Sequence, residues 1–140
     1  QVEAVRDLGP ERFMLAVGHN VEVFEVAHKR LTRYDGGDLA GLGHSHQRSV
    51  SSLALARRRG FTLSTSGSGG SLPAPGDLRV WDAQGQHLAA HRIVASPEAY
   101  PSAVCLGPEE LVFALVWTRE REHKEERVRS YVELRLADFR

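Results

Sequence analysis

The stretch "GDLRVWDAQGQ" (residues 76–86) decides the fold that the sequence predicts. Apolar and charged residues alternate up to a Trp-Asp pair, and a polar turn that contains Gly follows at once. This alternation and the turn are typical of a short β-strand that ends in a tight reversal. The stretch therefore predicts a strand over residues 77–82.

Similar strand signals recur along most of the chain. Each is short, rich in β-branched or aromatic residues, and bounded by Gly, Pro, Asn, Asp or Ser. No segment has an extended apolar stripe at helical spacing, so the chain is predicted to be mainly antiparallel β. The runs are "VEVFEV" (21–26), "SVSSLALA" (49–56), "FTLSTSG" (61–67), "ELVFALVW" (110–117) and "YVELRL" (131–136).

The predicted strands fall into three similar units, which cover residues of about 1–34, 46–94 and 100–140. Each unit offers a strand, a polar turn, an apolar strand, a connection, and a strand that ends near an acidic residue. The first two units add a fourth strand, "HKRLTR" (28–33) and "QHLAAHR" (86–92). We expect one domain made of these three units.

The middle unit, with its "LRVWD" strand, resembles the WD-repeat β-propellers. In that family a His before the first strand, a Ser or Thr on the second, a Trp on the third and a turn Asp form a hydrogen-bonded tetrad. The resemblance assigns these roles to His46, to the hydroxyl of Thr65 or Ser66, and to Trp81. Asp77 is the candidate carboxylate, although it lies closer to Trp81 than the turn Asp of the family does.

The resemblance implies an all-β fold of antiparallel four-stranded blades, about three of them, in an incomplete ring. Complete propellers have about four to eight blades, and an open arc exposes two sheet faces and unpaired edges. We therefore expect other protein chains, a second copy or further sequence to complete the ring. Four aromatic residues are assigned to the core: Phe24, Phe61, Trp81 and Trp117.

Three long connections, residues 34–46, 66–76 and 119–129, are expected on one face of the arc, where binding loops of rigid scaffolds lie. A solvated surface without a specific role is the alternative for these segments. The turn Arg57-Arg58-Arg59 on the opposite face is a candidate basic patch. The candidate interaction-face residues are His44, Arg119, Arg121, Lys124 and Arg127.

The composition favours no catalytic, metal or cofactor site. Eighteen basic residues balance eighteen acidic ones, which gives no general attraction to nucleic acid. The Gly-rich "STSGSGG" (64–70) lacks the Lys and the helix of a phosphate loop, and His44 and His46 lack further ligands for zinc. The single Cys105 excludes an intrachain disulfide and favours a reducing, cytoplasmic compartment. No apolar run approaches the roughly 20 residues of a membrane helix.

The expected function is that of a non-enzymatic scaffold for protein–protein interaction. Two alternatives stay open. The long insertion followed by "GDLRVWDAQGQ" is similar to the tandem propellers of echinoderm microtubule-associated-like and axonemal WD-repeat proteins, which implies binding to the cytoskeleton or a cilium. The second alternative is a subunit of a ribonucleoprotein assembly that contacts RNA through the arginine triplet, with binding that weakens steeply with salt.

Overall fold

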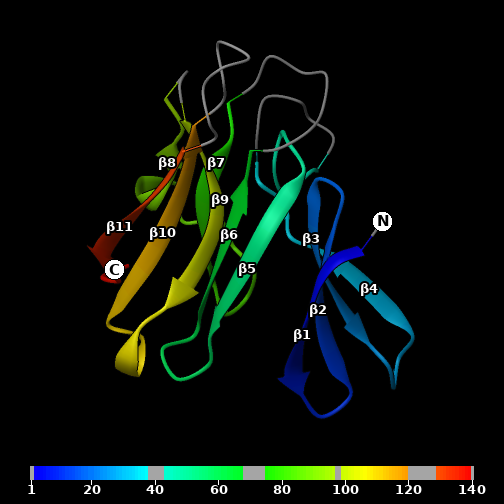
Figure 1. Cartoon of the computed structure of the whole chain (residues 1–140). Helices are drawn as coiled ribbons and strands as arrows, with labels where there is room; N and C mark the ends of the chain where they lie inside the picture. Colours follow the sequence, from blue (N-terminus) through cyan, green and yellow to red (C-terminus); the bar gives the residue numbers. More distant parts are fainter. Residues whose placement is uncertain (1, 38–42, 68–74, 97–98, 120–128, 140) are drawn as a thin grey trace.

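Three separate antiparallel sheets stand side by side in the computed structural model, which describes residues 2–37, 43–67, 75–96, 99–119 and 129–139 (Figure 1). Short 3-10 turns at Ala89–His91 and Pro108–Glu110 interrupt the strand order. The first sheet comprises β1 (Val2–Gly9), β2 (Arg12–Val17), β3 (Asn20–Glu25) and β4 (Arg30–Arg33). The middle sheet comprises β5 (Val50–Ala56), β6 (Phe61–Ser66), β7 (Asp77–Asp82) and β8 (Ile93–Val94). The third sheet comprises β9 (Ala99–Leu106), β10 (Val112–Arg119) and β11 (Arg129–Leu136).

Within each sheet the strands follow one another in chain order, and each pairs antiparallel with the next. The first strands of the three sheets, β1, β5 and β9, are neighbours, because β1 contacts β5 and β5 contacts β9. The last strands, β4, β8 and β11, lie at the far edges of their sheets. This arrangement confirms the predicted fold class: an all-β fold of blade-like antiparallel sheets that do not close into a ring.

The middle sheet carries the core, because it is covered on both faces. Every residue of β6 is buried, and one face of the sheet packs on the first sheet while the other packs on the third. A sheet covered on both faces needs apolar or hydrogen-bonded side chains at nearly every position. The cluster towards the first sheet contains Met14, Ala16, Val21, Val23, Tyr34, Val50, Leu53 and Trp81. The cluster towards the third sheet contains Ala54, Ala56, Phe61, Leu63, Leu78, Val80, Ala99, Val104, Phe113, Leu115, Trp117 and Ala137.

Tight turns set the register of the hairpins. Val17 pairs with Asn20, so the β2–β3 hairpin has a two-residue loop, Gly18-His19. Gly18 adopts a φ of 56°, which a two-residue hairpin requires and which glycine adopts at little cost. No helix in the described part of the chain is long and apolar enough to cross a membrane.

The fourth strand of the middle sheet differs from the prediction. "QHLAAHR" (86–92) was expected to form it, but residues 89–91 form a 3-10 turn and the strand is confined to Ile93–Val94. Alanine has a low strand propensity, and Ile93 and Val94 supply the β-branched side chains that pair with Leu78 and Asp77. The outer edge of the middle sheet is therefore short.

Candidate functional site: a buried polar network and two open sheet faces

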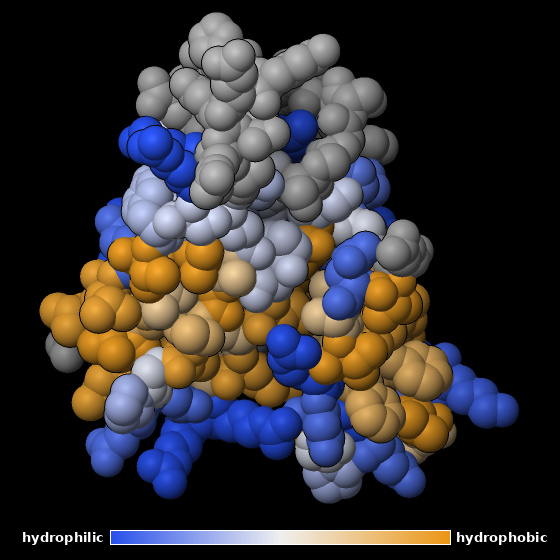
Figure 2. Space-filling view, in the orientation of Figure 1, coloured by the Kyte–Doolittle hydropathy of each residue, from blue (hydrophilic) through white to orange (hydrophobic). Residues whose placement is uncertain are grey.

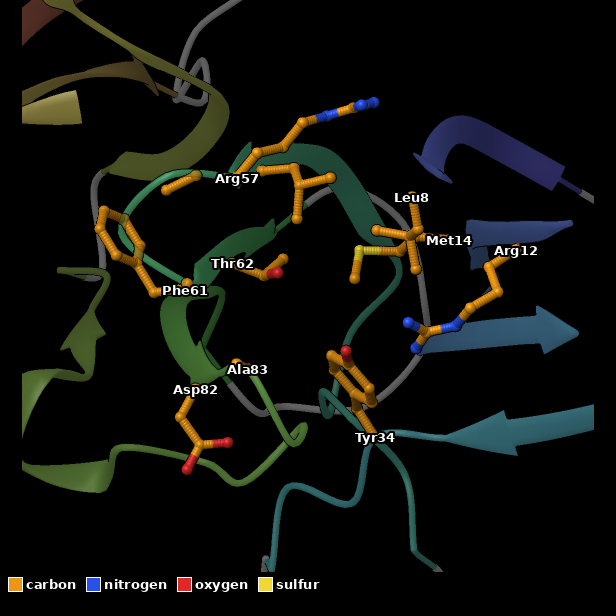
Figure 3. Close-up of a pocket in the computed structure, with 12 residues that line it drawn as sticks. Leu8, Arg12, Met14, Tyr34, Arg57, Phe61, Thr62, Asp82 and Ala83 are labelled. Atoms are coloured by element: carbon orange, nitrogen blue, oxygen red, sulfur yellow. The ribbon is translucent and has the colours of Figure 1, made fainter. Parts of the chain in front are cut away.

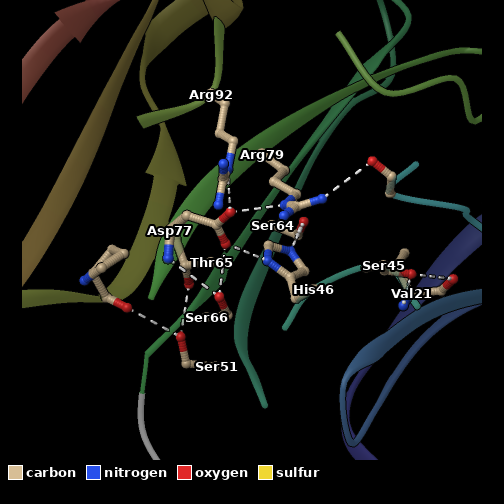
Figure 4. A network of polar contacts seen from close by, with 12 residues as sticks. Val21, Ser45, His46, Ser51, Ser64, Thr65, Ser66, Asp77, Arg79 and Arg92 are labelled. Atoms are coloured by element: carbon tan, nitrogen blue, oxygen red, sulfur yellow. Dashed lines mark hydrogen bonds and ion pairs between the residues drawn. The ribbon is translucent and has the colours of Figure 1, made fainter. Parts of the chain in front are cut away.

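Asp77 is the centre of a buried polar network at one end of the middle sheet (Figure 4). Its side chain is 2% exposed and accepts hydrogen bonds on both carboxylate oxygens. Oδ1 accepts from His46 Nδ1 at 2.7 Å and from the Ser66 hydroxyl at 2.8 Å. Oδ2 accepts from the Nε atoms of Arg79 at 2.8 Å and Arg92 at 2.6 Å. Four donors thus compensate the burial of one negative charge.

These contacts fix the charge of Asp77. Burial by itself raises the pKa of this carboxyl, but the hydrogen bond and charge of His46, together with Arg79 and Arg92, outweigh it. The pKa of Asp77 is therefore held well below its usual range. The carboxylate is ionised at neutral pH and forms an ion pair with Arg79, whose side chain is fully buried.

His46 connects Asp77 to Trp81 through the hydroxyl of Ser64. The Trp81 indole N–H donates to Ser64 Oγ at 2.8 Å, and Ser64 Oγ lies 2.6 Å from His46 Nε2. An indole nitrogen can only donate, so Ser64 accepts from Trp81. The imidazole thus faces Asp77 with Nδ1, and its Nε2 shares a hydrogen bond with the Ser64 hydroxyl.

The order of these contacts, Ser64–His46–Asp77, is that of a hydrolase triad, but the network is not built for catalysis. Ser64 is fully buried, and the Trp81 N–H already occupies its oxygen. A nucleophile needs an exposed oxygen beside a site for the reacting carbonyl. The network is therefore a structural element of the middle sheet.

His46, Asp77 and Trp81 lie together in this network, as the sequence predicts, but the hydroxyl between them comes from a different residue. The hydroxyl expected from Thr65 or Ser66 is supplied by Ser64. Thr65 pairs with Leu78 and points to the opposite face of the sheet, where its hydroxyl bonds to Ser51 Oγ at 2.8 Å. Ser66 instead donates to Asp77. The correction follows from the pleat, since neighbouring residues of a strand point to opposite faces.

Ser45 and His46 tie the first sheet to the middle sheet. The Ser45 hydroxyl accepts from the backbone N–H of Val21 at 2.8 Å and donates to the carbonyl of Tyr34 at 2.5 Å. The next residue, His46, bonds into the middle sheet. Arg79 adds a second link, because its Nη1 donates to the carbonyl of Gly36 at 3.3 Å. The sequence analysis identified neither Ser45 nor Arg79. A charged residue two positions before Trp81 lies on the same face of the strand, which was a usable signal for Arg79.

The candidate interaction-face residues are only partly described. His44 lies beside the first sheet, with its Nδ1 3.2 Å from Asn20 Oδ1 and its ring 5.7 Å from that of His19. Arg119 is the exposed last residue of β10. Three of the predicted residues lie outside the described part of the chain: Arg121, Lys124 and Arg127.

The arginine triplet links the middle sheet to both of its neighbours. The guanidinium of Arg57 donates to the backbone carbonyl of Asp7, and that of Arg59 donates to the carbonyls of Glu110 at 2.7 Å and Ala137 at 2.6 Å. The acceptors are neutral carbonyls and all three arginines are exposed, so the turn keeps its positive charge. The basic patch and the RNA alternative stay predictions.

The third sheet exposes an apolar face on the side away from the middle sheet. Alternate residues of β10 divide between the faces, and Leu115 is buried against the middle sheet. On the other face the β10 residues are half-buried and pair with hydrophobic residues of β11 that are largely exposed. Val132 is 62%, Leu134 73% and Leu136 77% exposed. Figure 2 shows hydrophobic residues gathered in a band across the strands of the molecule.

The first sheet exposes an apolar face at the other end of the arc. Phe13, Phe24 and Leu31 are cross-strand partners on this face, and Val5 and Leu15 form a second row beside them. Phe24 was predicted to lie in the core; it is half-buried here because its neighbour Val23 points to the middle sheet instead. Contiguous apolar surface of this kind marks interaction sites in soluble proteins.

The described residues offer no group of three or more His, Cys, Asp or Glu side chains that could hold a metal ion. Cys105 is exposed and pairs with Ala114 on the open face of the third sheet.

Comparison with solved structures places the three sheets among β-propellers. The chain is similar to the β-propeller domain of Cps50 (Swd1) from Myceliophteria thermophila, with a TM-score of 0.56 and 16% identity over 94% of this chain and 38% of that one. It is also similar to the hydrazine synthase of Kuenenia stuttgartiensis, with a TM-score of 0.65 and 10% identity over 91% of this chain and 36% of that one. The chain thus spans well under half of the solved chains that it matches. No protein-family model and no curated protein matches the sequence.

Proposed function

We propose that this chain is a non-enzymatic scaffold that binds other protein chains through the open apolar faces of its first and third sheets. The observation that carries the proposal is the large exposure of Val132, Leu134 and Leu136 on a regular sheet face. The middle sheet has apolar neighbours on both faces, so the same kind of face in the outer sheets has room for an equivalent neighbour.

The comparisons support this proposal without identifying the partner. The solved β-propeller domain continues well beyond the 38% of its chain that matches the three sheets. Further sheets that cover the first and third sheets would remove their apolar faces from water. Burial of apolar surface, helped by strand pairing at the edges, would hold such a partner.

The native molar mass, measured by light scattering on the isolated chain, tests the proposal. We expect a compact species at a multiple of 15.5 kDa, or one that carries a second polypeptide. Leu134→Lys places a charge in the centre of the open face and should shift the species towards the 15.5 kDa monomer. Ser130→Lys is the matched control, because it adds the same charge to the same face of β11 beside Thr118, outside the apolar stretch.

Either of two results would overturn the proposal. A folded 15.5 kDa monomer that binds no anilinonaphthalene sulfonate has neither a partner nor an accessible apolar face. Equal effects of Leu134→Lys and Ser130→Lys would likewise show that the added charge, and not the apolar face, changes the association.

A further inference from the structure

A cavity of about 250 Å³ lies between the first and middle sheets, away from the open faces (Figure 3). Its apolar lining includes Met14, Leu55 and Phe61, which come from β2, β5 and β6. Met14 is 1% exposed and belongs to the cluster that joins the two sheets. The cavity is therefore bounded by packed strands and is independent of the surfaces in the proposed function.

Three polar side chains surround this apolar lining. Arg12 begins β2, Tyr34 follows β4 and Asp82 ends β7. Figure 3 shows the guanidinium of Arg12 and the hydroxyl of Tyr34 directed towards the same space. Among the described residues, no ion pair holds the Arg12 guanidinium, which leaves this cation able to bind an anion.

The Tyr34 hydroxyl is a hydrogen-bond donor in this cavity. Burial raises its pKa; the charge of Arg12 lowers the pKa and the charge of Asp82 raises it. With the pKa raised overall, the phenol keeps its proton at neutral pH. Asp82 is occupied elsewhere, since its Oδ1 accepts the backbone N–H groups of Gln84 at 2.9 Å and Gln86 at 2.9 Å.

The guanidinium of Arg57 lies on the other side of the cavity, where it donates to the carbonyl of Asp7. Arg12 faces the cavity, Asp82 is bonded to backbone N–H groups, and Glu25, the cross-strand partner of Arg12, is paired with Arg30. The Arg12 guanidinium therefore attracts negative charge into the cavity. A cation and a phenolic donor beside an apolar lining suit a carboxylate that is attached to an apolar side chain. The volume is small and matches about one residue rather than a long peptide.

We propose that this cavity binds the carboxyl-terminal residue of another protein, when that residue has an apolar side chain. The terminal carboxylate accepts hydrogen bonds from Arg12 and Tyr34, and the side chain packs against Met14, Leu55 and Phe61. This binding site is separate from the open sheet faces and does not depend on completion of the ring.

Met14 gives a direct readout, because it is the only methionine of the chain. Protein labelled with ¹³C in the methionine methyl group is titrated with N-acetyl-leucine, and the single methyl signal is followed by NMR. We expect a saturable shift with a dissociation constant in the millimolar range, as for a ligand of this size. N-acetyl-leucinamide lacks the carboxylate and should bind about tenfold more weakly, because a charge-assisted hydrogen bond is lost.

Three variants assign the effect to the cavity. Arg12→Gln should remove the tenfold preference for the carboxylate, and Tyr34→Phe, which keeps the ring, should reduce it. Arg33→Gln is the control: Arg33 also lies on the first sheet but is exposed and pairs with Glu22 at 3.5 Å, on the face of β3 away from Arg12. It should leave the preference unchanged.

Each contrary result overturns the proposal. The first is a Met14 signal that responds to neither ligand, and the second is equal affinity for N-acetyl-leucine and N-acetyl-leucinamide. The third is a preference for the carboxylate that survives both Arg12→Gln and Tyr34→Phe. A third ligand, N-acetylglutamyl-leucinamide, has a side-chain carboxylate and a blocked terminus. If it binds as tightly as N-acetyl-leucine, the cavity recognises acidic side chains and the assignment to a carboxyl terminus is wrong.

Discussion

The Asp77→Asn variant tests whether the charge of the buried carboxylate stabilises the middle sheet. Asparagine has the same size and its oxygen can still accept from Arg79 and Arg92, but its amide nitrogen stands where Oδ1 accepts from His46 and Ser66. The variant lacks the negative charge beside the fully buried Arg79 and also the acceptor that Oδ1 offers to His46 and Ser66. Loss of one partner of a buried ion pair costs about 3–5 kcal/mol. Arg92 is 29% exposed and can regain water, so we expect a loss of about 3 kcal/mol.

The difference between the two proteins should also depend on pH. The pKa of Asp77 is depressed in the folded state, so its contribution to the free energy of unfolding is fully present above the unfolded value of about 3.9. That contribution is lost as the pH falls from this value through the folded pKa. We therefore expect a constant difference above about pH 5 and a decrease of about 1.4 kcal/mol per pH unit below about pH 4.

Urea unfolding followed by the fluorescence of Trp81 and Trp117 measures both quantities. Asp82→Asn is the matched control, because it lies on the same strand and accepts only backbone N–H groups, which asparagine also satisfies. The control should change the free energy of unfolding by less than about 0.5 kcal/mol. A loss below about 1 kcal/mol in Asp77→Asn near pH 7, or the same loss near pH 3, would refute the reasoning.

Three further changes probe other contacts. Ser64→Ala leaves the Trp81 indole N–H and His46 Nε2 without their partner and should lower the free energy of unfolding by about 2–5 kcal/mol. Thr65→Ala should lower it by about 1 kcal/mol, and equal losses in urea unfolding would contradict the role of Ser64. Gly36→Ala places a Cβ 2.6 Å from the carbonyl oxygen of Ser45 and should cost more than about 2 kcal/mol, so an unchanged melting temperature would speak against this packing. Glu110→Gln weakens hydrogen bonds from two backbone N–H groups of the β5–β6 turn at an exposed site, and calorimetry should detect a loss under about 1 kcal/mol.

The strands of the middle sheet were predictable because each carries its own local signal. "DLRVWD" forms β7 with the predicted bounds, Asp77–Asp82, and "FTLSTS" forms β6 over Phe61–Ser66. β-branched and aromatic residues between turn residues are sufficient evidence when the sheet has neighbours on both faces. The fourth strand was predicted over "QHLAAHR" (86–92) but lies at Ile93–Val94, because the alanines of the predicted segment have a low strand propensity.

The side chains of the buried network were harder to assign, because their positions depend on register. Ser64, Thr65 and Ser66 are three consecutive residues with hydroxyl groups, and a shift of one residue reverses the face on which each lies. Only the pairing of Ser64 with Arg79 shows which hydroxyl shares a face with Trp81. No pattern in one strand contains that information.

The position of Asp77 depends on the tertiary arrangement in the same way. The chain distance between Asp77 and Trp81 differs from the family's pattern, yet the first residue of β7 meets His46 directly. A carboxylate can thus reach the imidazole from the strand itself as well as from a turn. Spacing along the sequence therefore underestimated how complete the network is.

The adjacent residues Ser45 and His46 have a consequence for the way the chain unfolds. Repeat proteins open in units whose boundaries lie where neighbouring repeats interact weakly. Ser45 bonds to the backbone of Val21 and Tyr34, and His46 bonds to the middle sheet, so two neighbouring residues link the first and middle sheets through buried contacts. Hydrogen exchange should therefore show these two sheets opening as one cooperative unit, while β11 exchanges early on its own.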